Sequence, residues 1–430
     1  MSERGKGKNQ RIAARTQKMR ARNSRLIQIF AVVILACVMF AAGFLVRDHP
    51  YFLQRLGFPD TVTGLATNIV DQNDTKDVHN SLSMRVAEVE DKLKNDSLDE
   101  YNLDEVTVKT LEAFAGATYD PYLRYYTAER YRELLNQVGE GYAGIGVLFS
   151  EYNGMAYVVD VFDGSEAQLA GVQEGDFVES INGDNSQGWS RAEVAAKLSQ
   201  SNGSAVVITW RRPESLEADG GETFTTTLTC AEYDQTNVDT EYDEDRRVGY
   251  IKVRQFTQNS ASLVQTAINE LTAQGAGAFV LDVRDNPGGY LSQAVDIASL
   301  FMSSGTVVEI HTVDGIITKN ASSQTATALP LVVITNRNSA AGAEVLAAAL
   351  KESQRATVVG TTTMGKGSVQ TISVLSFGGA LRYTAAYYKT PEGRDIDLVG
   401  VAPDVTVEMS DEGDTQKEYA IGVATSLVRE

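Results

Sequence analysis

Residues 331–350 read LVVITNRNSAAGAEVLAAAL, an apolar strand followed by a short polar turn and an alanine-rich run that is helical from about Gly342. A strand that leads through a turn into a helix is the repeating unit of an α/β domain. The same order recurs on both sides, with strands expected at 250–253, 278–283 and 357–359 and helices at 260–273 and 293–301. Because the strands are apolar throughout, we predict a sheet covered by helices on both faces.

The region 139–212 has a different pattern, in which short β-rich runs alternate with two helix starts. Ser165 and Ser190 each stand three residues before a glutamine or glutamate, which is the spacing of a capping box. Asn182-Gly183 follows a strand and predicts a tight turn. This pattern predicts a compact α+β module.

The N-terminal 84 residues are expected to lie outside these domains. Residues 1–25 contain nine Lys/Arg and one Glu, and the 21 residues of the following segment, 26–46, contain no charge. As a helix, 21 residues span ~32 Å, which is enough to cross a ~30 Å hydrocarbon core. We therefore predict a single-pass transmembrane helix in the cell membrane, with the N-terminus in the cytoplasm and everything after Arg47 on the extracytoplasmic side. A cleavable signal peptide is the alternative, since Ala41, Ala42 and Gly43 are small.

Charge and rare residue types exclude several functions. Beyond residue 25 the chain has 29 Lys/Arg against 56 Asp/Glu, so it would repel nucleic-acid phosphates. Two cysteines, Cys37 and Cys230, cannot build a disulfide scaffold or a cysteine zinc cluster. Of three histidines, only His311 lies outside the N-terminal segments, which argues against a Ser/His/Asp triad.

The 139–212 module resembles a PDZ domain of the type found in bacterial proteases. The resemblance rests on an ordered set of glycine-bearing turns: Gly144-Ile145-Gly146-Val147, 164–172, Gly175-Asp176 and 181–183. Successive N–H groups in such a loop can bind a terminal carboxylate, and a peptide can add to the strand edge beside the helix after Ser190. The resemblance implies that Gly144, Ile145, Gly146 and Val147 bind peptide C-termini.

The last domain resembles the carboxy-terminal processing, or tail-specific, proteases. The matching segments are Asp120-Pro121-Tyr122, 249–256, LDVRDNPGG at 281–289, NRNSAAGAE at 336–344, GTTTMGKGSVQ at 360–370, 387–394 and 400–404. The resemblance implies an α/β protease core of crotonase-like type. The expected fold is thus a multidomain α+β and α/β protein with these parts: cytoplasmic segment 1–25, transmembrane helix 26–46, tether 47–84, helical region 85–138, PDZ domain 139–212, connector 213–247, catalytic domain 248–406 and C-terminal segment 407–430.

The family uses a serine nucleophile, a lysine base and a glutamine that is hydrogen-bonded to the lysine. The resemblance places the lysine at Lys366 and the glutamine at Gln370, while the nucleophile position is occupied by Ala341. Residue 341 precedes a helix, so the Gly342 N–H and a donor from the Gly288-Gly289 turn are expected to form an oxyanion hole. Burial would lower the pKa of Lys366 and make it a base near neutral pH.

Other interpretations of the same residues are weaker. The segment 360–366 approaches a phosphate-binding loop, but Gly367 stands where Ser or Thr would hold Mg²⁺. Ser339 is the hydroxyl nearest to residue 341 and is expected to be a turn residue rather than a substitute nucleophile. Asp282 and Asp285 form a carboxylate pair without further ligands, so no metal site and no cofactor are expected.

Two hypotheses for function remain open. In the first, the chain is a membrane-anchored C-terminal processing endopeptidase whose nucleophilic serine has been replaced at Ala341, so that it binds protein tails without cutting them. In the second, it is a natural pseudoprotease that acts as a PDZ peptide-binding scaffold. The expected partners are proteins with free C-termini and the membrane, but not nucleic acid. Assembly into a homo-oligomer is left open.

Overall fold

The computed structural model describes residues 81–135, 142–186, 188–201, 203–233, 236–410 and 413–428. They belong to two compact units, which divide between Glu100 and Tyr101. The first unit contributes one described helix, α3 (Leu82–Asp96), which is capped by the Ser81 side chain and has no buried residue. The second unit holds all other described elements, including the candidate site.

The predicted membrane helix at 26–46 lies outside the described residues. Within the ranges that are described, no helix combines the length and the apolar character needed to cross a membrane. This finding contradicts the predicted single-pass location in the cell membrane. The prediction of a single-pass location in the cell membrane is therefore corrected.

The PDZ-like module is built on an antiparallel sheet in the order β3-β4-β5-β6-β7. The strands are β3 (Val147–Tyr152), β4 (Met155–Val161), β5 (Phe177–Ile181), β6 (Ala205–Arg212) and β7 (Glu222–Thr229). Both predicted helix starts are confirmed, because Ser165 caps α6 (Glu166–Leu169) and Ser190 forms a capping box with Glu193 at the start of α7 (Arg191–Gln200). A short pair, β2 (Tyr142–Gly144) with β8 (Ala231–Tyr233), adjoins α7.

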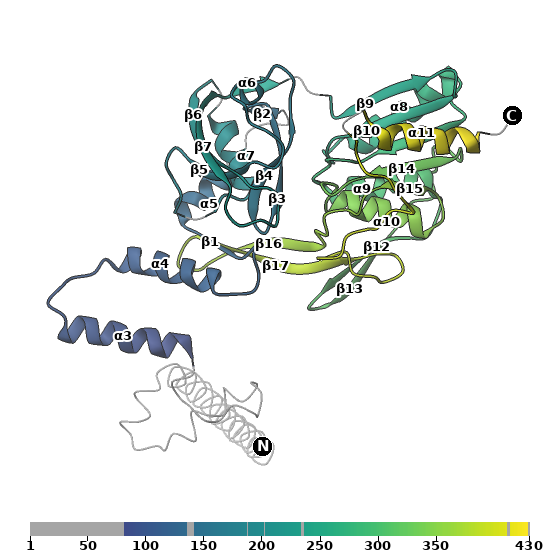
Figure 1. The fold of residues 1–430 in the computed structure, drawn as a ribbon. Helices are drawn as coiled ribbons and strands as arrows, with labels where there is room; N and C mark the ends of the chain where they lie inside the picture. Colours follow the sequence, from purple (N-terminus) through teal and green to yellow (C-terminus); the bar gives the residue numbers. More distant parts are fainter. Residues whose placement is uncertain are drawn as a thin grey trace, which may run out of the picture. The chain divides into compact units, whose positions relative to one another are not determined.

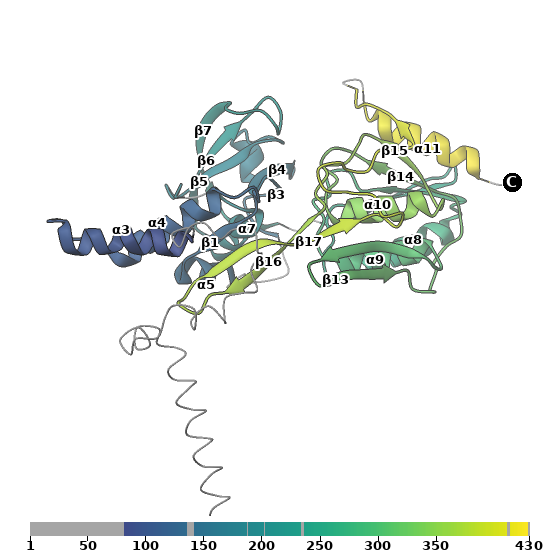
Figure 2. The ribbon, with the colours of Figure 1, turned by 90° about the horizontal axis from the view of Figure 1, so that it is seen from below.

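The α/β core is a six-stranded sheet in the order β18-β15-β14-β11-β10-β9, parallel except at β9. Its strands are β9 (Val238–Asp243), β10 (Val248–Val253), β11 (Ala278–Asp282), β14 (Leu331–Thr335), β15 (Thr357–Gly360) and β18 (Val405–Thr406). The helices are α8 (Ser260–Gln274), α9 (Leu291–Phe301), α10 (Gly342–Glu352) and α11 (Thr415–Leu427). The first three pack on one face and α11 on the other (Figures 1 and 2), so the predicted two-sided covering is confirmed.

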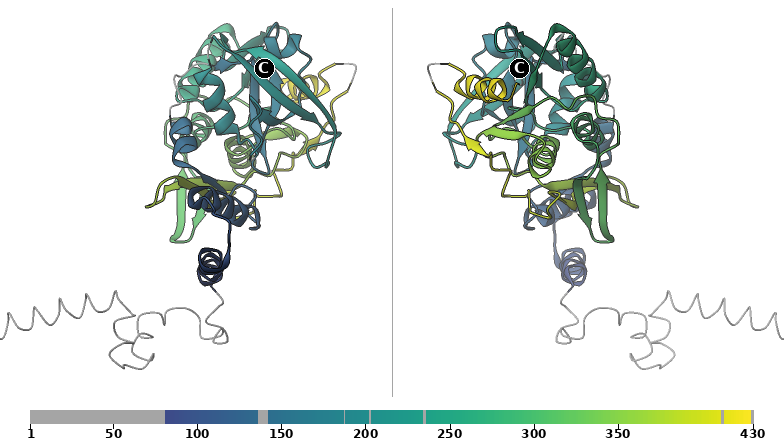
Figure 3. Two further views of the ribbon diagram at one scale, coloured as in Figure 1. Left: turned by 90° about the vertical axis from the view of Figure 1, so that its left-hand side faces the viewer. Right: turned by 90° about the vertical axis from the view of Figure 1, so that its right-hand side faces the viewer.

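A smaller sheet connects the α/β core to the helical region of the second unit. It contains β1 (Arg124–Tyr126), β12 (Thr306–Thr312), β13 (Gly315–Asn320), β16 (Ser368–Val374) and β17 (Ala380–Lys389). The long strand β17 pairs with β12 near one end and with β1 near the other, close to α4 (Leu103–Gly116) and α5 (Ala128–Leu135). The hairpin β12–β13 projects beyond the packed helices (Figure 3), and every residue of β13 is exposed.

The parallel pairing of β11 with β14 positions the candidate site. Phe279 to Asp282 align with Leu331 to Ile334, so both strands end at the same edge of the sheet. The turns that follow them, 283–289 and 336–341, therefore lie side by side, and α10 begins directly after the second turn. Functional side chains at this edge of an open α/β sheet are the usual arrangement.

Candidate active site

Ala341 occupies a strained turn between strand β14 and helix α10. Its backbone has φ 50° and ψ −109°, a conformation that residues with a Cβ rarely adopt. Such a backbone costs on the order of 1–3 kcal/mol and is concentrated at functional sites. A sharp strand–turn–helix junction is also the setting that exposes the nucleophile in α/β-hydrolases. The structure thus gives residue 341 a backbone suited to a nucleophile, although its side chain is a methyl group.

The N-terminus of α10 supplies a backbone donor next to Ala341. Within the described chain, no hydrogen bond to the Gly342 N–H is found. First-turn N–H groups of a helix are unpaired and lie at the positive end of its macrodipole. This geometry is compatible with the predicted oxyanion role of Gly342.

Gly288 lies against Ala341, but its N–H is already engaged. A Cβ built on Gly288 would stand 3.0 Å from the Ala341 Cβ and 3.1 Å from the Gly342 nitrogen, so this position has no space for a side chain. The Gly288 N–H donates to Asn286 Oδ1 at 2.8 Å. As the turn stands, this N–H is not available to an oxyanion. The neighbouring Gly289 is exposed, and its N–H has no hydrogen bond in the described part of the chain.

Glu344 connects residue 341 to the loop between β15 and β16, which carries Lys366. Its carboxylate is fully buried, and Oε2 accepts from the N–H groups of both Ala341 and Lys366, each at 2.8 Å. Oε1 accepts from Thr363 Oγ1 at 2.6 Å and from the Gly365 N–H at 2.7 Å. Burial raises the pKa of Glu344 to about 7, against the opposing effect of these four hydrogen bonds. From the sequence, the one signal of this role is that Glu344 stands three residues after Ala341, the spacing of a capping box.

The Lys366 ammonium lies in a buried, mostly charged environment. Its Nζ is 4.0 Å from Glu151 Oε2 and 5.4 Å from the centroid of the Tyr122 ring. Burial lowers the pKa of Lys366, the predicted direction, while the Glu151 carboxylate opposes that shift. Glu151 comes from β3 of the PDZ-like module and also accepts from Arg382 Nη2 at 2.8 Å. Sequence reasoning missed Glu151 and Arg382, because nothing local links residues 151, 366 and 382.

Gln370 does not reach Lys366 in this structure. Its Nε2 donates to Ser368 Oγ at 3.1 Å and to Thr384 Oγ1 at 3.5 Å, and no bond to Lys366 is found among the described residues. The expected lysine–glutamine hydrogen bond is therefore not formed here. The register of β16 against β17 shifts between Val369 and Gln370, and an ammonium group is held more strongly by a carboxylate than by a neutral amide.

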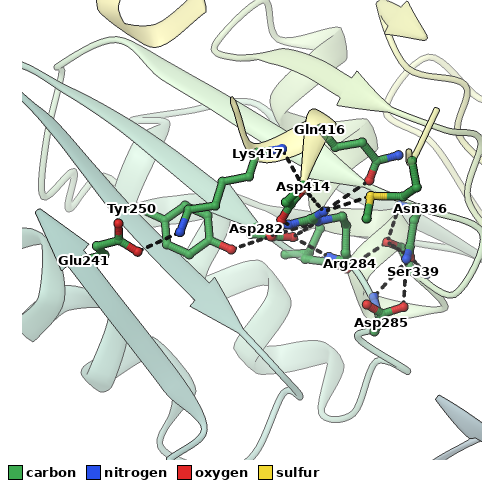
Figure 4. A network of polar contacts seen from close by, with 12 residues as sticks. Glu241, Tyr250, Asp282, Arg284, Asp285, Asn336, Ser339, Asp414, Gln416 and Lys417 are labelled. Atoms are coloured by element: carbon green, nitrogen blue, oxygen red, sulfur yellow. Dashed lines mark hydrogen bonds and ion pairs between the residues drawn. The ribbon is translucent and has the colours of Figure 1, made fainter. Parts of the chain in front are cut away.

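Two other polar residues near the site, Ser339 and Asp282, have structural roles. Ser339 is buried, and its hydroxyl donates to the Val283 carbonyl at 2.8 Å and accepts from the Asn336 N–H at 3.0 Å, as a turn residue does. The Asp282 carboxylate is bound by Arg284 and by the Tyr250 hydroxyl (Figure 4), so it is not directed at Asp285.

The predicted peptide-binding residues lie at the open edge of the PDZ-like sheet. Gly144 is the last residue of β2, and Val147 is the first residue of β3. Among the described residues, β4 is the one strand that pairs with β3. At Gly146 the φ is 82° and a Cβ would stand 2.2 Å from the Ser165 Cβ, so only glycine fits there. The edge of β3 and helix α7 have the arrangement that accepts an added peptide strand in PDZ domains.

Comparison with known proteins identifies relatives for both domains. The family model described as Peptidase family S41 matches residues 247–407, and the model of the PDZ domain matches residues 157–212. A carboxyl-terminal-processing protease of Synechocystis sp. is 34% identical over 313 residues, which cover 71% of this chain and 71% of that protein. A protein of the same name from Picosynechococcus sp. is 32% identical over 318 residues, or 71% and 76% of the two chains. The solved structure of a photosystem II D1 C-terminal processing protease superposes with a TM-score of 0.62 and 27% identity over 81% of this chain and 92% of that one.

Proposed function

The chain belongs to the carboxyl-terminal-processing serine proteases of peptidase family S41, and we propose that its site is built for serine–lysine hydrolysis of protein C-terminal tails. In this proposal residue 341 is the nucleophile position, Lys366 is the general base, and the Gly342 N–H binds the oxyanion. Because the methyl group of Ala341 cannot attack a carbonyl, the chain as it stands binds a tail and does not cut it.

The chemistry follows from these positions once a serine stands at residue 341. The serine Oγ attacks the scissile carbonyl carbon while its proton passes to the neutral Lys366 amine. The carbonyl oxygen becomes negative beside the Gly342 N–H and the positive end of α10. The lysine ammonium then protonates the leaving amine, and the neutral lysine activates the water that hydrolyses the acyl-enzyme. The PDZ-like module supplies the tail by adding it to the edge of β3.

The observation that carries this proposal is the strained backbone of Ala341 and its connection to Lys366 through Glu344. A φ of 50° is energetically unfavourable for alanine and has no function in an alanine residue. Burying a lysine also costs free energy, and peptide binding does not require it. Both features are accounted for if the fold evolved to hold a serine and its base at a fixed separation. They favour an inactivated protease over a scaffold.

The test is to replace Ala341 with serine in the full chain and measure cleavage of an unstructured protein with an apolar C-terminus. In other serine proteases the nucleophile contributes on the order of 10⁶ in kcat, so restored cleavage would be evident on a gel. The parent chain is the control for background hydrolysis, and tail binding is measured for both proteins. An Ala341→Ser protein that binds the tail normally but remains inert would support the alternative function, a PDZ peptide-binding scaffold.

A further inference from the structure

We propose that Asp285 is a positioning residue for the reaction, which clamps the turn of Gly288 and Gly289, packed against residue 341, onto the turn carrying the nucleophile position. The inference rests on the proposed function, and it adds a residue whose side chain touches neither substrate nor Lys366. Asp285 belongs to the turn after β11, whereas its partners belong to the turn after β14. Its contacts therefore determine how the two halves of the site are placed relative to each other.

The Asp285 carboxylate is bound by two amide side chains from the opposite turn. Its Oδ1 accepts from Asn336 Nδ2 at 2.7 Å and from Asn338 Nδ2 at 2.9 Å. In return, the Asp285 N–H donates to Asn336 Oδ1 at 3.1 Å (Figure 4). The pair of Asp285 and Asn336 is thus reciprocal, with each residue acting as donor and acceptor. Both NH₂ groups converge on the same oxygen, and an ionised carboxylate oxygen accepts two such bonds more strongly than a neutral amide oxygen.

The same two amides also organise the turn that leads to residue 341. Asn336 Oδ1 accepts from the N–H groups of Asn338 and Ser339, both at 3.1 Å, so Asn336 both shapes its own turn and binds Asp285. The Ala340 N–H donates to the Asn286 carbonyl at 2.9 Å, which is a second bond between the turns. A shift of the Asp285 carboxylate would therefore be transmitted to the residue before the nucleophile position.

Tyr157 of the PDZ-like module orients one of the two amides. Its buried hydroxyl donates to Asn338 Oδ1 at 3.3 Å. With its oxygen turned toward Tyr157, the Asn338 amide presents its NH₂ group to Asp285. Tyr157, Asn338 and Asp285 thus form a chain of hydrogen bonds. The Tyr157 hydroxyl can be removed from this chain without changing a residue of either active-site turn.

The backbone of Asp285 allows a conservative test. Its φ is 60°, in the left-handed region, where Asn and Asp are the best tolerated residues after glycine. Asp285→Asn therefore keeps both the shape and the backbone conformation, retains one oxygen that can face the two amides, and removes the negative charge that strengthens both bonds. Asp314→Asn is the matched control, because it removes one negative charge from an exposed turn between β12 and β13.

The first experiment measures kcat and KM in the Ala341→Ser background. Asp285→Asn should lower kcat by about 10²-fold with KM unchanged, because misplacement by about 1 Å has an effect of that size. Tyr157→Phe should lower kcat by about fivefold, the effect of one neutral hydrogen bond, and Asp314→Asn should change neither constant. The exchange Asp285→Asn with Asn338→Asp restores an amide–carboxylate pair and should recover at least tenfold of the lost kcat. A change confined to KM, or an unchanged kcat, would overturn the proposal.

The second experiment does not require activity and uses the chain with Ala341. Hydrogen exchange of segments 283–290 and 336–342 is followed in the parent, Asp285→Asn and Asp314→Asn proteins. Faster exchange in both segments of Asp285→Asn alone supports the clamp. Faster exchange in 283–290 alone would show that the turns are not coupled and would overturn it. If Ala341→Ser is inert with Asp285 intact, the proposed function fails, and the exchange result alone decides whether the clamp exists.

Discussion

The N–H groups of Ala341 and Lys366 donate to one and the same oxygen, Oε2 of Glu344, at 2.8 Å each. Ala341 and Lys366, the proposed nucleophile position and the proposed base, lie 25 residues apart in the sequence, and this shared acceptor sets the spacing between their backbones. A buried acceptor that serves donors from two segments couples them mechanically, since moving either one leaves a polar group unpaired.

Replacing Lys366 with methionine in the Ala341→Ser protein should abolish cleavage while the protein stays folded, because Arg382 still pairs with the buried Glu151 carboxylate. Methionine removes the base but fills the same space, and burying an ammonium group is unfavourable. We expect kcat to fall at least ~10³-fold, with tail binding retained. Turnover assays and thermal unfolding give the two measurements. Substantial cleavage by Lys366→Met would exclude lysine as the base.

Replacing Glu151 with glutamine should shift the pH–rate profile of the restored enzyme toward acid. The Glu151 carboxylate raises the pKa of Lys366, so its removal lowers that pKa and enlarges the neutral, basic fraction of the lysine at a given pH. Arg382, left without its carboxylate, acts in the same direction. The acidic limb of kcat/KM should move by about one pH unit.

The control for this change is Glu179→Gln, which breaks a different glutamate–arginine pair of the PDZ-like module, between Glu179 and Arg211. Its pH profile should coincide with that of the restored parent. An unchanged profile for Glu151→Gln, or a shift toward alkaline pH, would show that Glu151 does not act on the lysine.

Glu344 should make the stability of the fold depend on pH between about 4.5 and 7. Its pKa is 4.5 when exposed and about 7 in the folded chain, so the folded state binds the proton more tightly in this interval. The unfolded state therefore holds fewer protons, and the free energy of unfolding falls as pH rises. The contribution of this carboxyl is complete below pH 4.5, is lost as pH passes through 7, and amounts to about 3 kcal/mol.

Urea unfolding of the parent and Glu344→Gln proteins at pH 5 and pH 8 isolates this effect. The glutamine has no titration, so the stability advantage of the parent should shrink by up to ~3 kcal/mol over that interval. A constant difference would mean that the carboxylate stays ionised throughout and that its four hydrogen bonds outweigh its burial.

Substituting alanine at Gly288 should damage the site more than the same change at another left-handed glycine. At Gly288 the added Cβ meets both the Ala341 Cβ and the Ala340 carbonyl at 3.0 Å, in addition to the strain of a φ of 83°. Gly183 has almost the same φ, 82°, with nothing within 4 Å of the added Cβ. We expect Gly183→Ala to cost about 1 kcal/mol of stability and Gly288→Ala more than that.

A cleavage assay in the Ala341→Ser background distinguishes Gly288→Ala from Gly183→Ala further. Gly288→Ala should be inactive, because the turn is pushed away from residue 341, whereas Gly183→Ala should retain parental turnover. Equal losses of stability and activity in the two proteins would show that the contact between Gly288 and Ala341 is unimportant.

Local features of the fold could be predicted from the sequence because their causes are local. The N-cap at Ser165, the capping box at Ser190, the alternation of apolar strands with helices, and the start of α10 at Gly342 each depend on residues within a few positions. The position of Ala341 at a strand–turn–helix junction followed from the same short-range pattern. Membrane spanning was also predicted from a local run, and the described structure does not support that location.

The environment of the site was decided only by the tertiary structure. The ion pair of Lys366 with Glu151, the hydrogen bond of Gln370 to Thr384, and the hydrogen bonds between Asp285 and Asn336 all join residues from different segments of the fold. Sequence spacing carries no information on such pairs, since they depend on how β3, β11, β14 and β16 pack. The sequence alone predicted the positions of the nucleophile and of the lysine base, and it showed that residue 341 lacks a hydroxyl. The packed fold determined which charges face the lysine, and hence the pKa at which it can act.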